Sequence, residues 1–96
     1  MKLLRVEPSD RAAKKKQAIF EYPDGKQKKI HFGATGYTDF TLGASQDRKK
    51  AYQQRHASGK NARPDTADAL SYHILWGSSR SVRENVKSFR AKYKLD

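Results

Sequence analysis

Six basic side chains lie between Ser45 and Pro64, in a segment whose only carboxylate is Asp47. Guanidinium and ammonium groups bind phosphates and carboxylates through charge-assisted hydrogen bonds. This segment is therefore the strongest candidate in the chain for a surface that binds an anionic partner. Its six cationic residues are Arg48, Lys49, Lys50, Arg55, Lys60 and Arg63.

The stretch IHFGATGYTDFT, residues 30–41, is a second candidate, because glycine-rich loops after a strand can cradle phosphate with backbone N–H groups. Here no Lys-Ser or Lys-Thr pair follows the glycines, and the third glycine of a dinucleotide fingerprint is missing. We therefore expect a structural loop that buries its aromatic residues and Leu42. Its marked residues are Gly33, Gly36, Tyr37, Asp39 and Phe40.

Asp39 is the acid of most interest, because it lies in this loop among few other charges. A carboxylate there can accept backbone N–H groups in an Asx-type turn, or form a buried ion pair with Arg48 or Arg55. A structural role is favoured, since a lone acid does not perform paired acid–base chemistry.

Catalytic and metal-binding patterns are missing from the sequence. The three histidines, His31, His56 and His73, match no metal-ligand spacing, and there is no cysteine to join them. His31 and His73 are expected to be hydrogen-bonded residues of the core or its boundary. We expect no cofactor, no metal and no enzymatic activity.

The charge balance favours an anionic partner. The 96 residues include 21 Lys and Arg against 10 Asp and Glu, a formal net charge of +11. Nucleic acid, phosphate headgroups and acidic protein surfaces all fit this excess; the alternative is that it only keeps the protein soluble. No apolar run approaches a membrane span, and MKLLRVEPSD lacks the apolar stretch of a signal peptide. We expect synthesis inside the host cell and no integral membrane segment.

The first half of the chain predicts β-structure. Residues 1–16 form a basic N-terminal segment, in which Lys2 to Val6 is an edge strand or a tail. Arg11 to Lys16 is a solvated loop or an electrostatic contact with phosphate. Residues 17–96 form a single small domain. It begins with a β-hairpin, Ala18 to Tyr22 against Lys26 to Phe32, around a Pro-Asp-Gly turn.

The second half predicts three helices. Ser45 caps a helix that runs to about His56, and residues 57–64 form a linker. Asp65 caps a second, apolar helix that ends before Gly77. Ser81 opens a third, amphipathic helix with a capping box. The fold class is α+β, a small antiparallel hairpin or sheet packed on two or three short helices. The predicted core consists of Phe32, Phe40, Leu70, Ile74, Trp76, Val86 and Phe89.

Three motifs together resemble a group of small, uncharacterised proteins of large nucleocytoplasmic DNA viruses. They are HFGATGYTDFT at His31 to Thr41, DRKKAYQQRH at Asp47 to His56, and DTADALSYHILWG at Asp65 to Gly77. The resemblance covers roughly residues 26 to 92. It implies no established activity and no catalytic residue, and it suggests a protein of the virus particle.

Charge and resemblance together predict a non-catalytic structural component of the virion, a minor capsid or cement-type protein. Its expected partners are other capsid proteins or an acidic protein surface. The alternative is a sequence-nonspecific binding protein for DNA or RNA that is associated with the viral genome.

Overall fold

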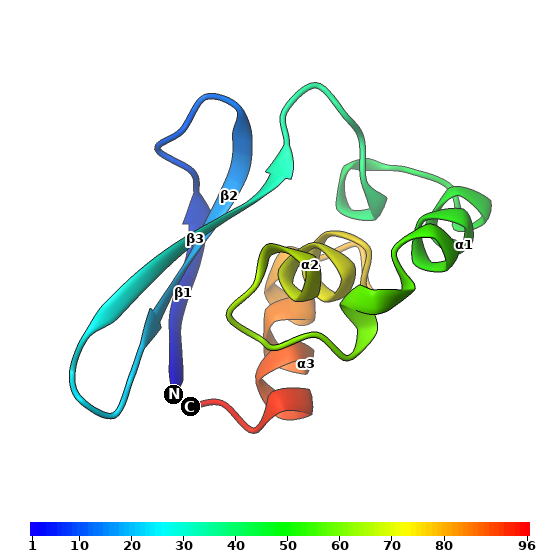
Figure 1. The fold of residues 1–96 in the computed structure, drawn as a ribbon. Helices are drawn as coiled ribbons and strands as arrows, with labels where there is room; N and C mark the ends of the chain where they lie inside the picture. The colour runs from blue at the N-terminus through cyan, green and yellow to red at the C-terminus, as the bar shows by residue number, and fades with distance from the viewer.

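A three-stranded antiparallel sheet forms one side of the structure, a computed structural model that describes residues 1–96 (Figure 1). The strands are β1 (Lys2–Pro8), β2 (Lys14–Glu21) and β3 (Gln27–Ala34), in the order β1-β2-β3. The predicted hairpin is confirmed as β2 and β3. Its turn uses Gly25 at φ 84°, a left-handed conformation that glycine adopts without strain.

The N-terminal segment is part of this sheet. β1 is an edge strand, and the side chain of Leu3 is 1% exposed in the core. β2 begins at Lys14, so the prediction of a loop up to Lys16 is wrong for its last three residues. The boundary drawn between residues 16 and 17 therefore falls inside the central strand.

The helical side contains α1 (Gln46–Arg55), α2 (Ala67–Leu70) and α3 (Val82–Tyr93). Three shorter helical segments join them: η1 (Phe40–Leu42), η2 (Ala57–Lys60) and η3 (Ser71–Leu75), a π-helical turn that continues α2. In Figure 1 the sheet lies to one side of α2 and α3, and α1 lies farthest from it. The α+β prediction is confirmed.

Local capping explains where two of the helices begin. The Ser45 side chain accepts the Arg48 N–H, and Ser81 accepts the Glu84 N–H, as predicted. The second half of the predicted capping box is wrong, because the Ser81 N–H donates to Oγ of Ser79 and not to Glu84. The predicted cap at Asp65 is wrong, because Thr66 caps α2 through the Ala69 N–H.

Asp65 is held by two other side chains. It accepts hydrogen bonds from Tyr22 and Arg63, at 2.8 and 3.2 Å. Burial raises the pKa of Asp65, but these hydrogen bonds outweigh burial and hold the pKa below its usual range. The predicted linker is also more ordered than expected, since η2 occupies residues 57–60 and its Gly59 is buried.

All seven residues of the predicted core are buried, and they form one cluster with Leu3, Ala18, Phe20, Ala44, Ala69 and Leu75. Gly33 allows β3 to approach η3 closely. It adopts φ 78°, and a Cβ atom there would lie 2.6 Å from Cδ1 of Leu75. A side chain at this position would push the sheet away from the helices.

The two ends of the chain lie side by side (Figure 1). The Leu3 N–H donates to the Asp96 carbonyl at 3.2 Å. The Arg90 guanidinium of α3 donates to the carbonyls of Leu3 and Leu4, at 2.7 and 3.3 Å. These bonds tie the edge strand to the last helix. None of the helices has the length and apolar character needed to cross a membrane.

His73 makes the stability of this fold depend on pH. Its ring is half-buried beside Phe89 and Tyr93, and Nε2 donates to the Lys60 carbonyl at 2.8 Å. Burial lowers the pKa of His73, and Lys92 adds to the shift. A lowered pKa means that the folded state favours the neutral ring. The stability that the neutral His73 ring contributes is present above the unfolded-state pKa of about 6.5. It is lost as pH falls through the folded-state pKa.

We therefore expect the free energy of unfolding to fall as pH is lowered from about 7.5 to about 5, a window above most carboxyl titrations. Urea denaturation at a series of pH values measures this slope. His73→Gln is expected to flatten it. His56→Gln, at an exposed position, is the matched control. An equal slope in wild type and His73→Gln would contradict the assignment.

Candidate anion-binding site

A cleft of about 600 Å³ opens between the sheet and the helices, and we call it the α1 cleft. One wall is formed by the ends of β2 and β3 and the loop that follows, and the other by α1, α2 and η3. Its apolar lining includes Phe32, Leu75 and Trp76. Its basic lining consists of Lys14 and Lys15 from β2 with Arg48 and Arg55 from α1.

Helical spacing explains why α1 contributes so much of this lining. Residues three or four positions apart share one face of a helix, so Arg48, Tyr52 and Arg55 point the same way. Ala51 and His56 border the same stripe and also line the cleft. Arg48 and Arg55 are exposed, so their guanidinium groups remain open to a ligand, while Tyr52 between them is partly buried against the core.

Three aromatic rings support the α1 wall. The ring of Tyr52 stacks on Trp76 with 4.5 Å between centroids and 8° between planes, and His56 stacks on Tyr52 at 4.3 Å. Burial against Trp76 raises the pKa of Tyr52. The stack fixes the position of Tyr52 between the two arginines.

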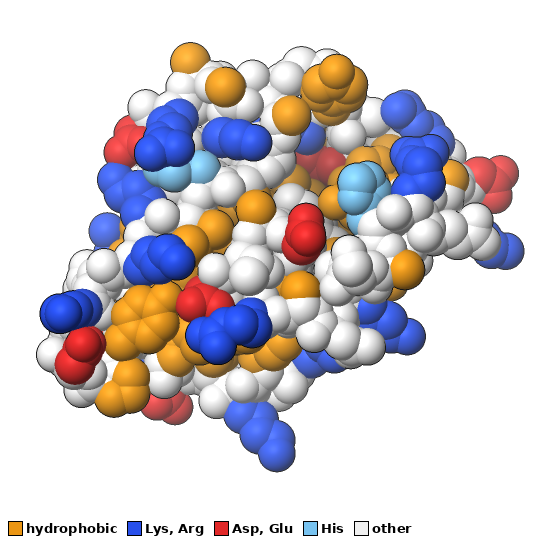
Figure 2. All heavy atoms as spheres, viewed as in Figure 1, with side chains coloured by type: hydrophobic (Ala, Val, Ile, Leu, Met, Phe, Trp, Pro, Cys, Tyr) orange, Lys and Arg blue, Asp and Glu red, His pale blue; other side chains and the backbone are white.

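The electrostatic character of the α1 cleft follows from which charges are paired. Lys15 is neutralised by the Asp39 carboxylate, with 2.7 Å between Nζ and Oδ2. Lys14, Arg48 and Arg55 have no acidic group within 4.0 Å. Asp68 is the single carboxylate on the lining. Figure 2 shows hydrophobic side chains in the seam between the sheet and the helices, with Lys and Arg around it.

The six predicted cations separate into different environments. Arg48 and Arg55 line the α1 cleft, whereas Lys50 is exposed and is not part of the lining. Lys49 lies over the Phe40 ring at 4.1 Å from its centroid and donates to the Gly77 carbonyl.

The other two cations, Lys60 and Arg63, also lie outside the cleft, and Arg63 pairs with Asp65. The structure therefore brings two of the six together and adds Lys14. Lys14 belongs to the basic run at residues 11–16, but its place beside Ala34 depends on strand register.

The glycine-rich loop has the predicted structural role, with a different partner. Asp39 is 1% exposed, and its side chain caps η1 by accepting the N–H groups of Thr41 and Leu42. Its ion pair is with Lys15 of β2, so the predicted pairing with Arg48 or Arg55 is wrong. The carboxylate holds the loop to the sheet rather than to α1.

The exposure of the loop side chains differs from the prediction. Phe40 is buried as expected, but Tyr37 is 74% exposed and Leu42 is 63% exposed. Gly36, at φ 85°, turns the chain so that Tyr37 stands at the loop tip. The expectation that all three side chains pack inside is therefore wrong. Tyr37 instead lines the α1 cleft.

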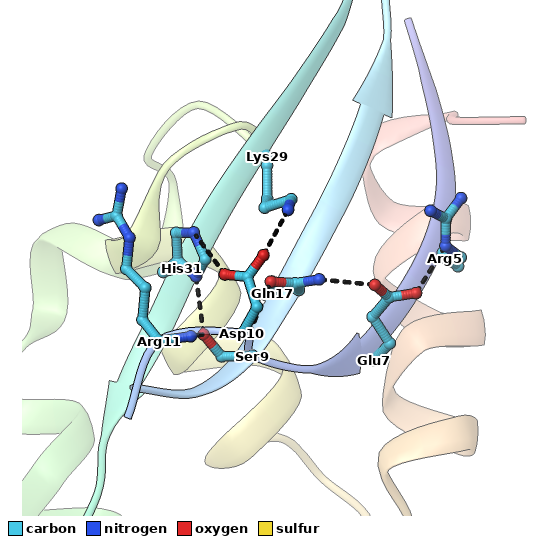
Figure 3. Close-up of polar contacts among 8 residues, drawn as sticks. All are labelled: Arg5, Glu7, Ser9, Asp10, Arg11, Gln17, Lys29 and His31. Atoms are coloured by element: carbon cyan, nitrogen blue, oxygen red, sulfur yellow. Dashed lines mark hydrogen bonds and ion pairs between the residues drawn. The ribbon is translucent and has the colours of Figure 1, made fainter. Parts of the chain in front are cut away.

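A separate polar network covers the outer face of the sheet (Figure 3). Ser9 Oγ lies 2.7 Å from Nδ1 of His31, and Asp10 Oδ1 lies 3.8 Å from its Nε2. A hydrolase triad has the carboxylate bonded to Nδ1 and the serine at Nε2, the reverse of this order. Asp10 is instead bonded to Lys29 at 2.7 Å.

This network fastens the β1–β2 loop to the sheet. It extends to Gln17, which donates to Glu7 at 2.6 Å and accepts the N–H of Asp10. His31 is a hydrogen-bonded boundary residue, as predicted, and so is His73 at the Lys60 carbonyl.

Comparison with known proteins places the chain among uncharacterised relatives. Residues 4–56 match the family described as "Family of unknown function (DUF5754)". The chain is 37% identical over 81 residues to "Uncharacterized protein L851" of Acanthamoeba polyphaga mimivirus, a large nucleocytoplasmic DNA virus. This match covers 76% of the chain and 80% of the viral protein. No solved structure matches the chain.

Proposed function

The chain belongs to DUF5754, a family of unknown function, and has a homologue in a large DNA virus; we propose that it is a non-catalytic structural protein of the virion that binds an acidic partner. In this role it is a minor capsid or cement-type protein. The viral homologue supports the setting, and the charge of the surface supports the class of partner.

The observation that carries this proposal is the set of unpaired cations at the α1 cleft. Lys14, Arg48 and Arg55 have no carboxylate partner within the chain, so an acidic surface placed there satisfies three charges without displacing an existing ion pair. Tyr37 and Leu42 on the neighbouring loop are the two large exposed hydrophobic side chains. They supply the apolar contacts that a stable protein interface needs beside its charges.

The location is tested by fractionating purified virus particles into shell and genome and identifying the chain by mass spectrometry. We expect it in the shell fraction. Its absence from purified particles would contradict a structural role in the virion.

The charge requirement is tested with fluorescent poly-glutamate as the acidic probe. We expect Arg48→Gln/Arg55→Gln to weaken binding about tenfold at low salt, because two charge-assisted contacts are lost. Arg83→Gln/Lys87→Gln removes the same charge from exposed positions on α3, outside the cleft, and is the matched control. Equal weakening in both double variants would mean that only net charge matters, and it would overturn the assignment to the α1 cleft.

Sequence-nonspecific nucleic-acid binding is a second candidate function. It is favoured by the exposed Tyr37 ring beside the cationic lining, because aromatic side chains next to basic grooves stack on unpaired bases. On this alternative the chain is found with the genome fraction, and its affinity for single strands falls with salt by about 0.7 log units per log unit for each phosphate neutralised.

A further inference from the structure

The α1 cleft has both apolar and cationic lining, a combination that suits a ligand with an apolar part and an anionic part. Its volume of about 600 Å³ lies within the range of about 300–1,000 Å³ that is typical of small-ligand sites. Its lining combines apolar and aromatic side chains, among them Phe32, Leu75 and Trp76, with polar ones, and three cations without partners lie on it. An inorganic anion alone would leave the apolar lining exposed to water, and a purely apolar ligand would leave the cations without an anionic partner.

Tyr37 is the ring in this cleft with both faces free, whereas His56 has one face stacked on Tyr52. It makes no aromatic or cation–π contact in the protein and is 74% exposed. Tyr52, by contrast, is already stacked on both Trp76 and His56. An added planar group therefore has its stacking partner in Tyr37, while Tyr52 serves to hold the α1 wall in place.

We propose that the α1 cleft binds a single unpaired nucleotide, with its phosphate at Arg48, Arg55 and Lys14 and its base stacked on Tyr37. Arginines seven positions apart on one helix face and a lysine from the facing strand offer donors from both walls. Asp68 accepts hydrogen bonds only, so it faces donor groups such as a base amino group or a sugar hydroxyl. The nucleotide is either free or a unit of a single strand, since both present this chemistry.

This inference rests on the second candidate function, nucleic-acid binding, and it is narrower. Nonspecific attraction to phosphate needs only positive charge and accepts a duplex as readily as a single strand. The α1 cleft as a nucleotide site requires an unstacked base. Within a duplex every base is already stacked and paired, so its rings are not available to Tyr37.

Trp76 provides the readout, because it is the single tryptophan of the chain and lines the cleft. Trp76 fluorescence is titrated at low salt with four probes: thymidine monophosphate, a short oligo(dT), a duplex of the same length, and inorganic pyrophosphate. We expect oligo(dT) to change the fluorescence in the wild-type protein. Competition by thymidine monophosphate identifies a site for the free nucleotide, and binding of the strand alone identifies a unit of single-stranded nucleic acid.

Tyr37→Ala is the decisive variant, and Leu42→Ala is its matched control. Both replace an exposed hydrophobic side chain of the same loop, but only Tyr37 lines the cleft. We expect Tyr37→Ala to weaken oligo(dT) binding about tenfold, to leave pyrophosphate binding unchanged, and to be rescued by Tyr37→Phe. Arg48→Gln/Arg55→Gln is expected to weaken the binding of both oligo(dT) and pyrophosphate.

Two results would overturn the nucleotide site. The first is equal oligo(dT) affinity in Tyr37→Ala and Leu42→Ala, and the second is duplex binding as tight as single-strand binding with no change in Trp76. If either appears while oligonucleotides still bind in a salt-dependent way, the general nucleic-acid function stands and the specific site fails. No binding of oligo(dT), of the duplex or of thymidine monophosphate at low salt overturns both the nucleotide site and the general nucleic-acid function. Retained poly-glutamate binding then leaves the proposed virion function intact.

Discussion

Replacing Asp39 by alanine is expected to lower the free energy of unfolding by about 3 kcal/mol, because it breaks a buried ion pair from one side. The Asp39 side chain is 1% exposed and that of Lys15 is 14% exposed. Removing the carboxylate leaves the Lys15 ammonium in a largely desolvated position. It also removes the acceptor that caps η1 at Thr41 and Leu42, a loss of about 1 kcal/mol when a cap is deleted alone.

The two contributions separate in further variants. Asp39→Asn keeps a capping oxygen but not the charge, so we expect a smaller loss than for Asp39→Ala. Lys15→Met/Asp39→Asn removes both charges and is expected to recover part of the stability, as replacement of buried pairs by uncharged groups often does. Asp47→Asn, an exposed carboxylate in the first turn of α1, is the control, with an expected change of about 0.5 kcal/mol. Urea denaturation measures all four. A loss below about 1 kcal/mol for Asp39→Ala would contradict the structural role.

Asn85→Ala is expected to cost about 3 kcal/mol, because one buried amide satisfies the backbone of the turn between η3 and α3. Nδ2 donates to the carbonyls of Ile74 and Ser79 at 2.8 and 2.7 Å, and Oδ1 accepts the Ser79 N–H at 3.0 Å. Asn85 is 1% exposed, so at least the Ile74 carbonyl is left without a partner when the amide is removed. Gly77 packs directly against this amide, and a Cβ atom there would collide with the His73 carbonyl oxygen.

The side-chain chemistry of Asn85 is tested by a second substitution. Asn85→Asp has nearly the same shape but turns a carboxylate oxygen toward two carbonyls, so we expect a loss at least as large as for alanine. Asn61→Ala changes an exposed asparagine and is expected to stay within about 0.5 kcal/mol of wild type. If Asn85→Ala and Asn61→Ala have the same free energy of unfolding in urea denaturation, water can replace the Asn85 amide as the hydrogen-bond partner of the turn backbone, and the assigned role is contradicted.

Local signals accounted for much of the fold. The Pro-Asp-Gly turn, the caps at Ser45 and Ser81 and the apolar spacing of α3 each depend on neighbouring residues, and each is found where it was expected. The cap of α2 is predicted at the wrong residue because Asp65 and Thr66 are adjacent and both are common capping residue types. A tyrosine 43 positions away takes the carboxylate, and Thr66 is left as the cap.

The candidate site was less accessible to sequence analysis because it is assembled across the fold. The spacing of Arg48, Tyr52 and Arg55 was visible on one helix, but the opposite wall depends on strand pairing. Lys14 reaches the cleft only because it pairs with Ala34, and Lys15 meets Asp39 across 24 positions. Nothing local distinguishes these lysines from the rest of their basic run.

The hydrogen bonds from Arg90 to Leu3 and Leu4 also affect the order of events during synthesis. They join residues 87 and 86 positions apart, so they form only after residue 90 has left the ribosome. Contacts of such wide separation carry a large loop-closure cost and slow folding. Until then β1 is an edge strand without these hydrogen bonds. During that period its unpaired backbone is open to other nascent chains.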